Sequence, residues 1–167
     1  PELSWSANAR LTKVATAPLM PPLPGRVSGE LTARGRQDPT ELEIDIRELT
    51  GIVRDRPVSA RGRLVLEGGQ IQARGLQLRS GNSELSADGH PGAPDGLTVQ
   101  ARIASLADLA DGASGAFNGS ATVSLNPARP LLRLDGNGEQ LVWGDMAIGE
   151  LALSTDPTGE AGSKALV

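Results

Sequence analysis

Residues 26–34 read Arg-Val-Ser-Gly-Glu-Leu-Thr-Ala-Arg, a strict alternation between small or apolar side chains and polar ones. A period of two places successive side chains on opposite faces of a β-strand, so the stretch predicts a strand with one apolar and one polar face. The same alternation covers nearly every other segment, including residues 40–49 and 58–67. The sequence therefore predicts an all-β fold.

The stretch at 26–34 has a counterpart about ninety residues later, in which Phe117, Gly119, Ala121 and Val123 stand where Val27, Gly29, Leu31 and Ala33 stand earlier. A long recurring unit is typical of elongated, stacked proteins that bind along their length. We therefore expect residues 1–167 to form one segment of a longer chain. Its two imperfect repeats are predicted at about 1–90 and 91–167.

The apolar positions carry an unusual mixture of side chains. The chain has one Phe, two Trp and no Tyr, and its Leu, Val and Ile residues are interspersed with Ala and Gly. Protein cores do not tolerate unfilled volume. Either two sheets press tightly together, or something else occupies the space beside the apolar face.

Charge and metal-ligand content exclude several classes of function. Sixteen basic and 20 acidic residues are intermixed, for a net charge of −4, and no basic run exists that would attract nucleic acid. With no Cys and one histidine, His90, the usual zinc and haem ligand sets cannot be built, and no cofactor is expected. No base stands beside a serine to activate it, so an enzyme is not expected. No apolar run is long enough for a membrane span.

The alternation predicts strands at 2–14, 26–34, 40–49, 58–67, 70–79, 82–89, 96–103, 116–125, 130–136, 140–143, 146–154 and from 164 onward. Its phase breaks at Gly75, at Gly149 and between Ile46 and Leu49, which predicts β-bulges and a curved sheet. Short helical turns are expected near 17–23 and 104–111.

Several motifs occur in an order that resembles the TamB family, the AsmA-like, bridge-like lipid transfer proteins of the bacterial translocation and assembly module. They are Pro57–Gly69 (PVSARGRLVLEGG), Leu76–Asn82 (LQLRSGN), Leu85–Gly89, Leu106–Leu109 (LADL), Ser114–Gly119, and Trp143–Ile148 (WGDMAI) leading to Leu151–Leu153.

The resemblance implies an elongated, curled, open antiparallel or mixed sheet, a β-taco, with an apolar interior groove. It further implies a periplasmic protein that is anchored in the inner membrane, moves phospholipids between the membranes and works with an outer-membrane barrel partner of the module. For this segment the resemblance implies no catalytic residue, no cofactor and no direct membrane span.

The pattern and the resemblance together predict a non-enzymatic lipid conduit whose groove binds phospholipid acyl chains. The predicted lipid-binding residues are Leu3, Trp5, Val27, Leu31, Leu42, Ile44, Ile46, Leu64, Leu66, Leu76, Leu78, Leu85, Leu97, Val99, Ile103, Phe117, Val123, Leu125, Leu132, Leu134, Leu141, Trp143, Ile148, Leu151 and Leu153. Two alternatives stay open: a chaperone-like scaffold for outer-membrane protein (autotransporter) assembly that binds through its groove or edge strands, and an inert spacer with a well-packed core.

Overall fold

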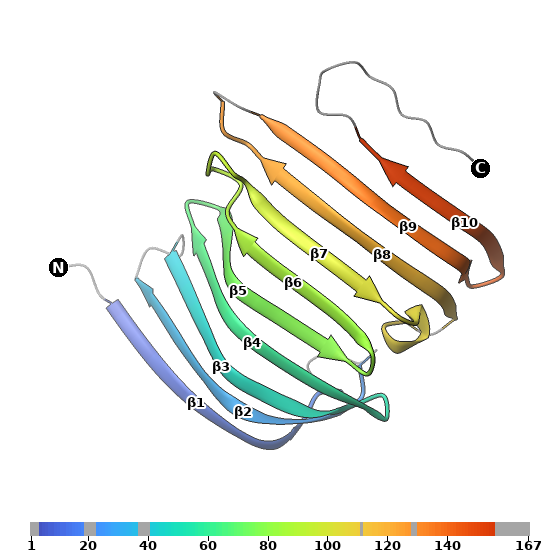
Figure 1. Cartoon of the computed structure of the whole chain (residues 1–167). Helices are drawn as coiled ribbons and strands as arrows, with labels where there is room; N and C mark the ends of the chain where they lie inside the picture. The colour runs from blue at the N-terminus through green and yellow to red at the C-terminus, as the bar shows by residue number, and fades with distance from the viewer. Residues whose placement is uncertain (1–3, 19–22, 37–40, 111, 128–129, 156–167) are drawn as a thin grey trace.

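The fold is a ten-stranded antiparallel sheet in which every strand pairs with its neighbours in sequence (Figure 1). The computed structural model describes residues 4–18, 23–36, 41–110, 112–127 and 130–155. The strands are β1 (Ser4–Ala15), β2 (Gly25–Arg36), β3 (Glu41–Val53), β4 (Arg56–Glu67), β5 (Gln70–Ser80), β6 (Ser83–Gly89), β7 (Leu97–Ile103), β8 (Ala113–Ser124), β9 (Leu131–Trp143) and β10 (Met146–Ser154). A 3₁₀ turn, η1 (Leu106–Asp108), lies between β7 and β8.

Two-residue turns join several of these strands. Gly68 and Gly69, between β4 and β5, have φ angles of 57° and 77°, and Arg54 and Asp55, between β3 and β4, have φ angles of 52° and 60°. Positive φ at both central residues matches the twist of antiparallel hairpins, which is why such turns connect adjacent strands tightly. The sheet order therefore follows from local turn geometry.

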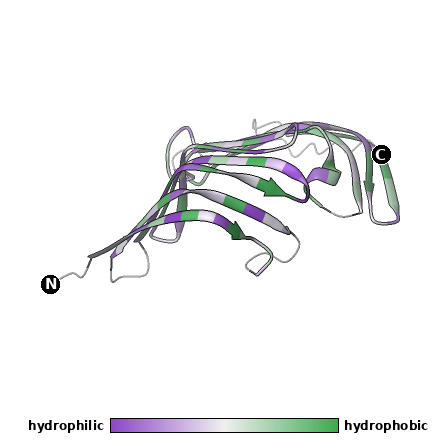
Figure 2. Ribbon diagram, turned by 90° about the horizontal axis from the view of Figure 1, so that it is seen from below, coloured by the Kyte–Doolittle hydropathy of each residue, from purple (hydrophilic) through white to green (hydrophobic). Residues whose placement is uncertain are grey.

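The sheet is open, and it is neither closed into a barrel nor strongly curled (Figure 2). Strands β1 and β10 form its two edges. The chain exposes 11474 Å² of surface, whereas a compact monomer of 17.2 kDa exposes about 7,800 Å². The excess is what a single-layer sheet produces, because each face that a second layer would cover remains accessible.

The bulges predicted at the phase breaks are confirmed. Pairing shifts register around Gly75, around Gly149 and between Ile46 and Leu49. A further shift follows Leu11 in β1, close to Lys13, which has a φ of 50°. Bulges increase local twist and bend the strand, so they account for the bending of the longer strands in Figure 1.

Several strand boundaries differ from the prediction, and β3 continues to Val53, beyond the predicted end at 49. The segments 130–136 and 140–143 form one strand, β9, because Gly136 and Gly138 continue the ladder by pairing with β8 and β10. The predicted strand 116–125 begins at Ala113 and ends at Ser124. The helical turn expected at 104–111 is confirmed as η1. Most of the turn expected at 17–23 and the strand from 164 onward lie outside the described residues.

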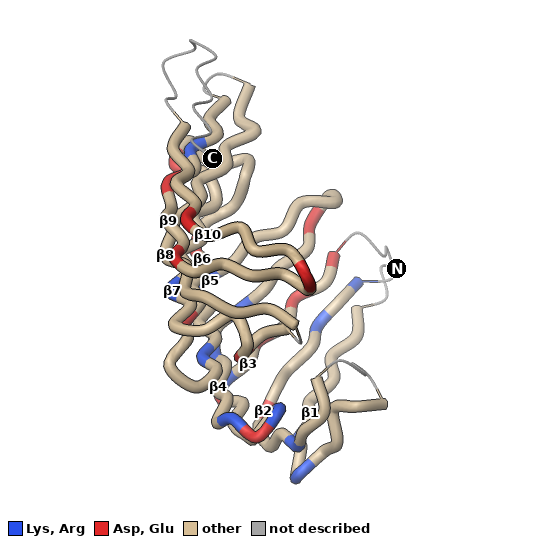
Figure 3. The backbone as a smooth tube through the Cα atoms, turned by 90° about the vertical axis from the view of Figure 1, so that its right-hand side faces the viewer, with Lys and Arg blue, Asp and Glu red and all other residues tan. Residues whose placement is uncertain are grey.

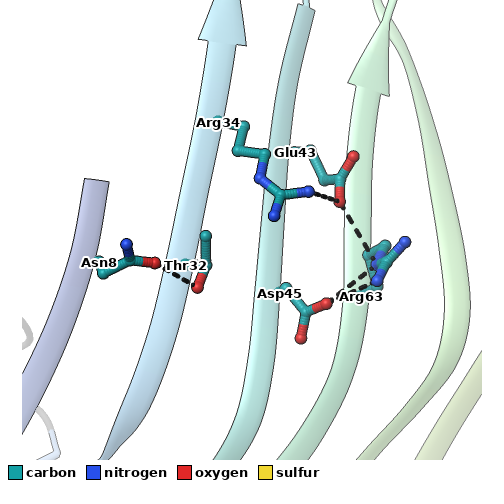
Figure 4. A network of polar contacts seen from close by, with 6 residues as sticks. All are labelled: Asn8, Thr32, Arg34, Glu43, Asp45 and Arg63. Carbon is teal, nitrogen blue, oxygen red and sulfur yellow. Dashed lines mark hydrogen bonds and ion pairs between the residues drawn. The ribbon is translucent and has the colours of Figure 1, made fainter. Parts of the chain in front are cut away.

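Residues of both charge signs are interspersed along the strands (Figure 3), and Arg34, Glu43, Asp45 and Arg63 form a network of ion pairs across β2, β3 and β4 on one face, which we call the charged face (Figure 4). Arg63 bonds to Asp45 at 2.7 Å and lies 3.5 Å from Glu43, which in turn lies 3.9 Å from Arg34. The hydrogen bond to Asp45 and the negative charge of Glu43 raise the pKa of Arg63. Exposed ion pairs of this kind add little stability, but opposite charges on facing strands favour the observed register.

Candidate functional site: an uncovered apolar face

The other face is apolar, and its rows of side chains run across the whole sheet. Directly opposed residues in an antiparallel ladder point to the same side of the sheet. One row follows the pairing through all ten strands from β1 to β10: Leu11, Gly29, Leu49, Ala60, Leu78, Leu85, Ala101, Gly119, Gly136 and Leu153. We call this side of the sheet the apolar face. No charged or polar side chain interrupts this row.

Among the described residues, no second layer packs on the apolar face. Its large side chains are accordingly exposed, with Trp5 at 48%, Leu132 at 55% and Trp143 at 59%. The buried hydrophobic residues are Ala73, Ala87, Ile103, Ala113 and Leu141, most of them small. Large contiguous apolar surfaces on soluble proteins mark binding sites for other molecules. The apolar face is therefore accessible for binding an apolar partner.

Glycines on the apolar face make room for aromatic rings, which lie close over the backbone at these positions. A Cβ atom added at Gly35 would lie 2.7 Å from the indole of Trp5. One added at Gly119 or Gly136 would lie 2.8 or 2.9 Å from the ring of Phe117. The rings thus cover backbone where side chains are missing, much as aromatic residues compensate for glycines in designed sheets.

A small apolar hollow remains beside Phe117. It has a volume of about 120 Å³ and is lined mainly by residues of β7, β8, β9 and β10, among them Val99, Ala101, Phe117, Ala121, Leu134 and Leu153. The small side chains Ala101 and Ala121 leave this space, as the interspersed Ala and Gly residues in the sequence indicated. The hollow lies on the apolar face and is continuous with solvent.

The structure places nearly all the predicted site residues on the apolar face. Leu3 lies outside the described residues. Leu125 follows the end of β8 and is 63% exposed, and Ile148 lies at the bulge between Ala147 and Gly149 without a partner in β9. These two are therefore not part of the register that builds the face.

The predicted lipid-binding residues do not include other members of the apolar face, among them Leu11, Leu49, Val58, Ile71 and Met146, although the alternation itself places Leu11 and Val58 on the apolar side of their strands. Leu11 and Leu49 adjoin register shifts, and Ile71 and Met146 are the second and first residues of strands that follow hairpin turns. The signal that would have found them is the hairpin pairing, which places each of them opposite a residue already assigned to the face.

Within the described parts of the chain, no cluster of three or more His, Asp or Glu side chains could hold a metal ion. Among the same residues, no helix has the length and apolarity needed to cross a membrane.

A single antiparallel sheet with one charged face and one uncovered apolar face defines a class of open, single-layer β-sheet proteins that present a continuous apolar surface. Within that class, the chain belongs to the TamB family: the family model described as "TamB, N-terminal domain" matches residues 1–163. The prediction of this family from the sequence motifs is thus confirmed.

A curated relative supports the same assignment. The chain is 25% identical over 135 residues to the translocation and assembly module subunit TamB of Haemophilus influenzae. The match covers 79% of this chain and 10% of the relative, so the chain spans about a tenth of the length of that protein. No solved structure matches the chain.

Proposed function

We propose that this chain is a non-enzymatic segment of a periplasmic lipid conduit, in which the apolar face shields phospholipid acyl chains during transport between the inner and outer membranes. The observation that carries the proposal is the uninterrupted apolar row across ten paired strands, open to solvent along its length. Membership of the TamB family supports it.

Acyl chains suit such a surface on physical grounds. Burial of apolar area is non-directional and contributes about 25 cal/mol per Å². A face that treats each methylene alike holds a chain without fixing its position, so a lipid can slide. The rings of Trp5 and Phe117, which lie close over glycines, add apolar area to this face.

The proposal extends to the longer protein, of which this chain corresponds to a small part. There we propose that the sheet curls further into a β-taco groove, with repeats of about ninety residues, anchored at the inner membrane and docking on an outer-membrane barrel partner. The correspondence of β2 and β3 with β8 and β9 in sequence is the basis for the repeat.

Matched charge variants test transport. On the apolar face, Leu85→Arg, Val99→Arg and Ala121→Arg place cations on β6, β7 and β8. On the charged face of the same strands, Ser86→Arg, Gln100→Arg and Ser120→Arg are the controls, since these three residues pair with one another. In the full-length protein the apolar-face triple should abolish lipid flux in cells lacking redundant transporters, because a charged constriction opposes acyl chains.

The conduit proposal would be overturned if the stably folded apolar-face triple variant transported lipid normally and the charged-face triple variant did not. Mass spectrometry gives an independent measurement: phospholipid should copurify with the wild-type chain and be depleted in the apolar-face triple. A lipid-free wild-type protein would support the spacer alternative.

The free edges of the sheet favour one second candidate, a scaffold for outer-membrane protein assembly. Among the described residues, β1 and β10 each pair with a neighbour on one side only, and unpaired strand edges accept further strands by β-augmentation. A photo-crosslinker at Asn8 or Glu150, in these strands, should then capture an unfolded autotransporter β-domain, and one at Leu85 should not. The reverse pattern, with lipid at Leu85, supports the conduit.

A further inference from the structure

A buried carboxylate stands at one rim of the sheet, in the 3₁₀ turn η1. The side chain of Asp108 is 2% exposed, and its Oδ1 lies 2.9 Å from Nη1 of Arg56, the first residue of β4. Oδ1 has no well-aligned hydrogen bond besides this ion pair, and Ser83 Oγ lies 3.4 Å from Oδ2. A buried charge without a partner is costly, so the contact with Arg56 is what makes the position of Asp108 tenable.

Within the described residues, this contact spans more of the sheet than seven ion pairs that join side chains of adjacent strands. Those pairs join neighbouring strands: Arg10–Glu30, Arg34–Glu43, Arg36–Glu41, Arg47–Glu30, Arg63–Glu43, Arg63–Asp45 and Arg79–Glu84. Arg56 and Asp108 instead connect β4 with the link between β7 and β8. Strands β5 and β6 lie between β4 and β7, the strand that leads into this link.

The span of this contact matters because a single-layer sheet bends easily. Each strand pair tolerates a twist of about −10 to −35°, and contacts between neighbours leave the accumulated bend across several pairs unspecified. A contact between β4 and the link that follows β7 specifies that sum. On the same rim, Ser83 Oγ also accepts a hydrogen bond from the backbone N–H of Ala104 at 3.1 Å, which ties the β7–β8 link to the start of β6.

We propose that η1 is a strut: the Asp108–Arg56 ion pair sets the bend of the sheet between β4 and β8, and with it the shape of the apolar face. The strut is a conformational device of the fold and holds whether or not the apolar face binds lipid.

Spin-label distances test the strut, and the chain has no cysteine to remove first. Labels at Thr50 in β3 and Asn118 in β8 stand in one row of the charged face, five strand spacings or about 24 Å apart. Arg56→Gln and Asp108→Asn should broaden the distance distribution and shift its mean. Arg56→Lys keeps the charge and should retain the wild-type distribution.

Arg79→Met is the matched control, because it removes an ion pair between neighbouring strands inside the labelled interval; the distribution should stay as in wild type. The proposal is overturned if folded Arg56→Gln and Asp108→Asn give the wild-type distribution, or if Arg79→Met changes it as much. Loss of the β-sheet circular dichroism signal in Arg56→Gln would also overturn it, since the pair would then be required for folding itself.

Discussion

At the scale of single residues, side chains on the apolar face differ sharply in burial even within one strand. Leu78 and Ala73 both stand on β5, with exposures of 41% and 2%. An arginine at position 78 can reach water past its neighbours, so Leu78→Arg should lose only the partial burial of the leucine, about 1–2 kcal/mol of unfolding free energy. Urea denaturation measures this loss.

The matched variant Ala73→Arg should lower the free energy of unfolding by about 3 kcal/mol or more. The neighbours of position 73 leave no room for the arginine side chain, and its charge would be buried without a partner. Equal losses for the two variants would mean that position 78 is covered in solution, and the apolar face would then be a packed core.

At the scale of elements, the bulges depend on particular glycines. Gly62 in β4 has a φ of 124°, and an added Cβ would lie 2.5 Å from the Cα of Leu76 on β5. Gly62→Ala should therefore destabilise the protein by about 2 kcal/mol or more, through backbone strain and the clash between strands. The thermal midpoint and urea denaturation report the loss.

Gly68→Ala is the control for Gly62→Ala. Gly68 also has a positive φ, 57°, but its Cβ would meet open space. Only the conformational cost of about 1 kcal/mol applies there. If the turn variant proved the more damaging of the two, close approach of β4 and β5 at the bulge would be the wrong explanation.

Much of the sheet could be predicted because alternation and hairpin turns are local signals. Gly75 and Gly149 marked bulges since glycine adopts positive φ at little cost. The bulge at Lys13, which has a φ of 50°, contains no glycine and so carries no such signal. The glycines at 136 and 138 suggested a break, yet Phe117 and Leu141 cover them.

The absence of a second layer among the described residues could not be predicted from the pattern. A strand such as β3 has the same alternation in a sandwich as in an open sheet, because it has one apolar face in both. In the sandwich a second sheet covers that face, and in the open sheet it stays exposed. The deciding quantity is what packs opposite that face, and strand periodicity does not encode it. For the same reason, lipid binding by residues such as Leu85 stays a prediction.

At the scale of the whole molecule, an open sheet should be visibly less compact than a globule. A compact 167-residue chain has a radius of gyration of about 15 Å. Small-angle X-ray scattering of the monomer should give a clearly larger radius of gyration. The circular dichroism spectrum of the same sample should show little helix. A radius near 15 Å would show that the sheet folds onto itself and hides its apolar face.

The sequential order of the strands has a mechanical consequence. The backbone of each strand is hydrogen-bonded only to the strands before and after it in the described sheet. Each strand can therefore pair without a contact from a distant part of the chain, and the loop-closure entropy of each step is small. The sheet can be laid down hairpin by hairpin from either end. When the protein is pulled by its termini in a single-molecule force experiment, the strands should detach one after another from the edges of the sheet, in a series of small force steps.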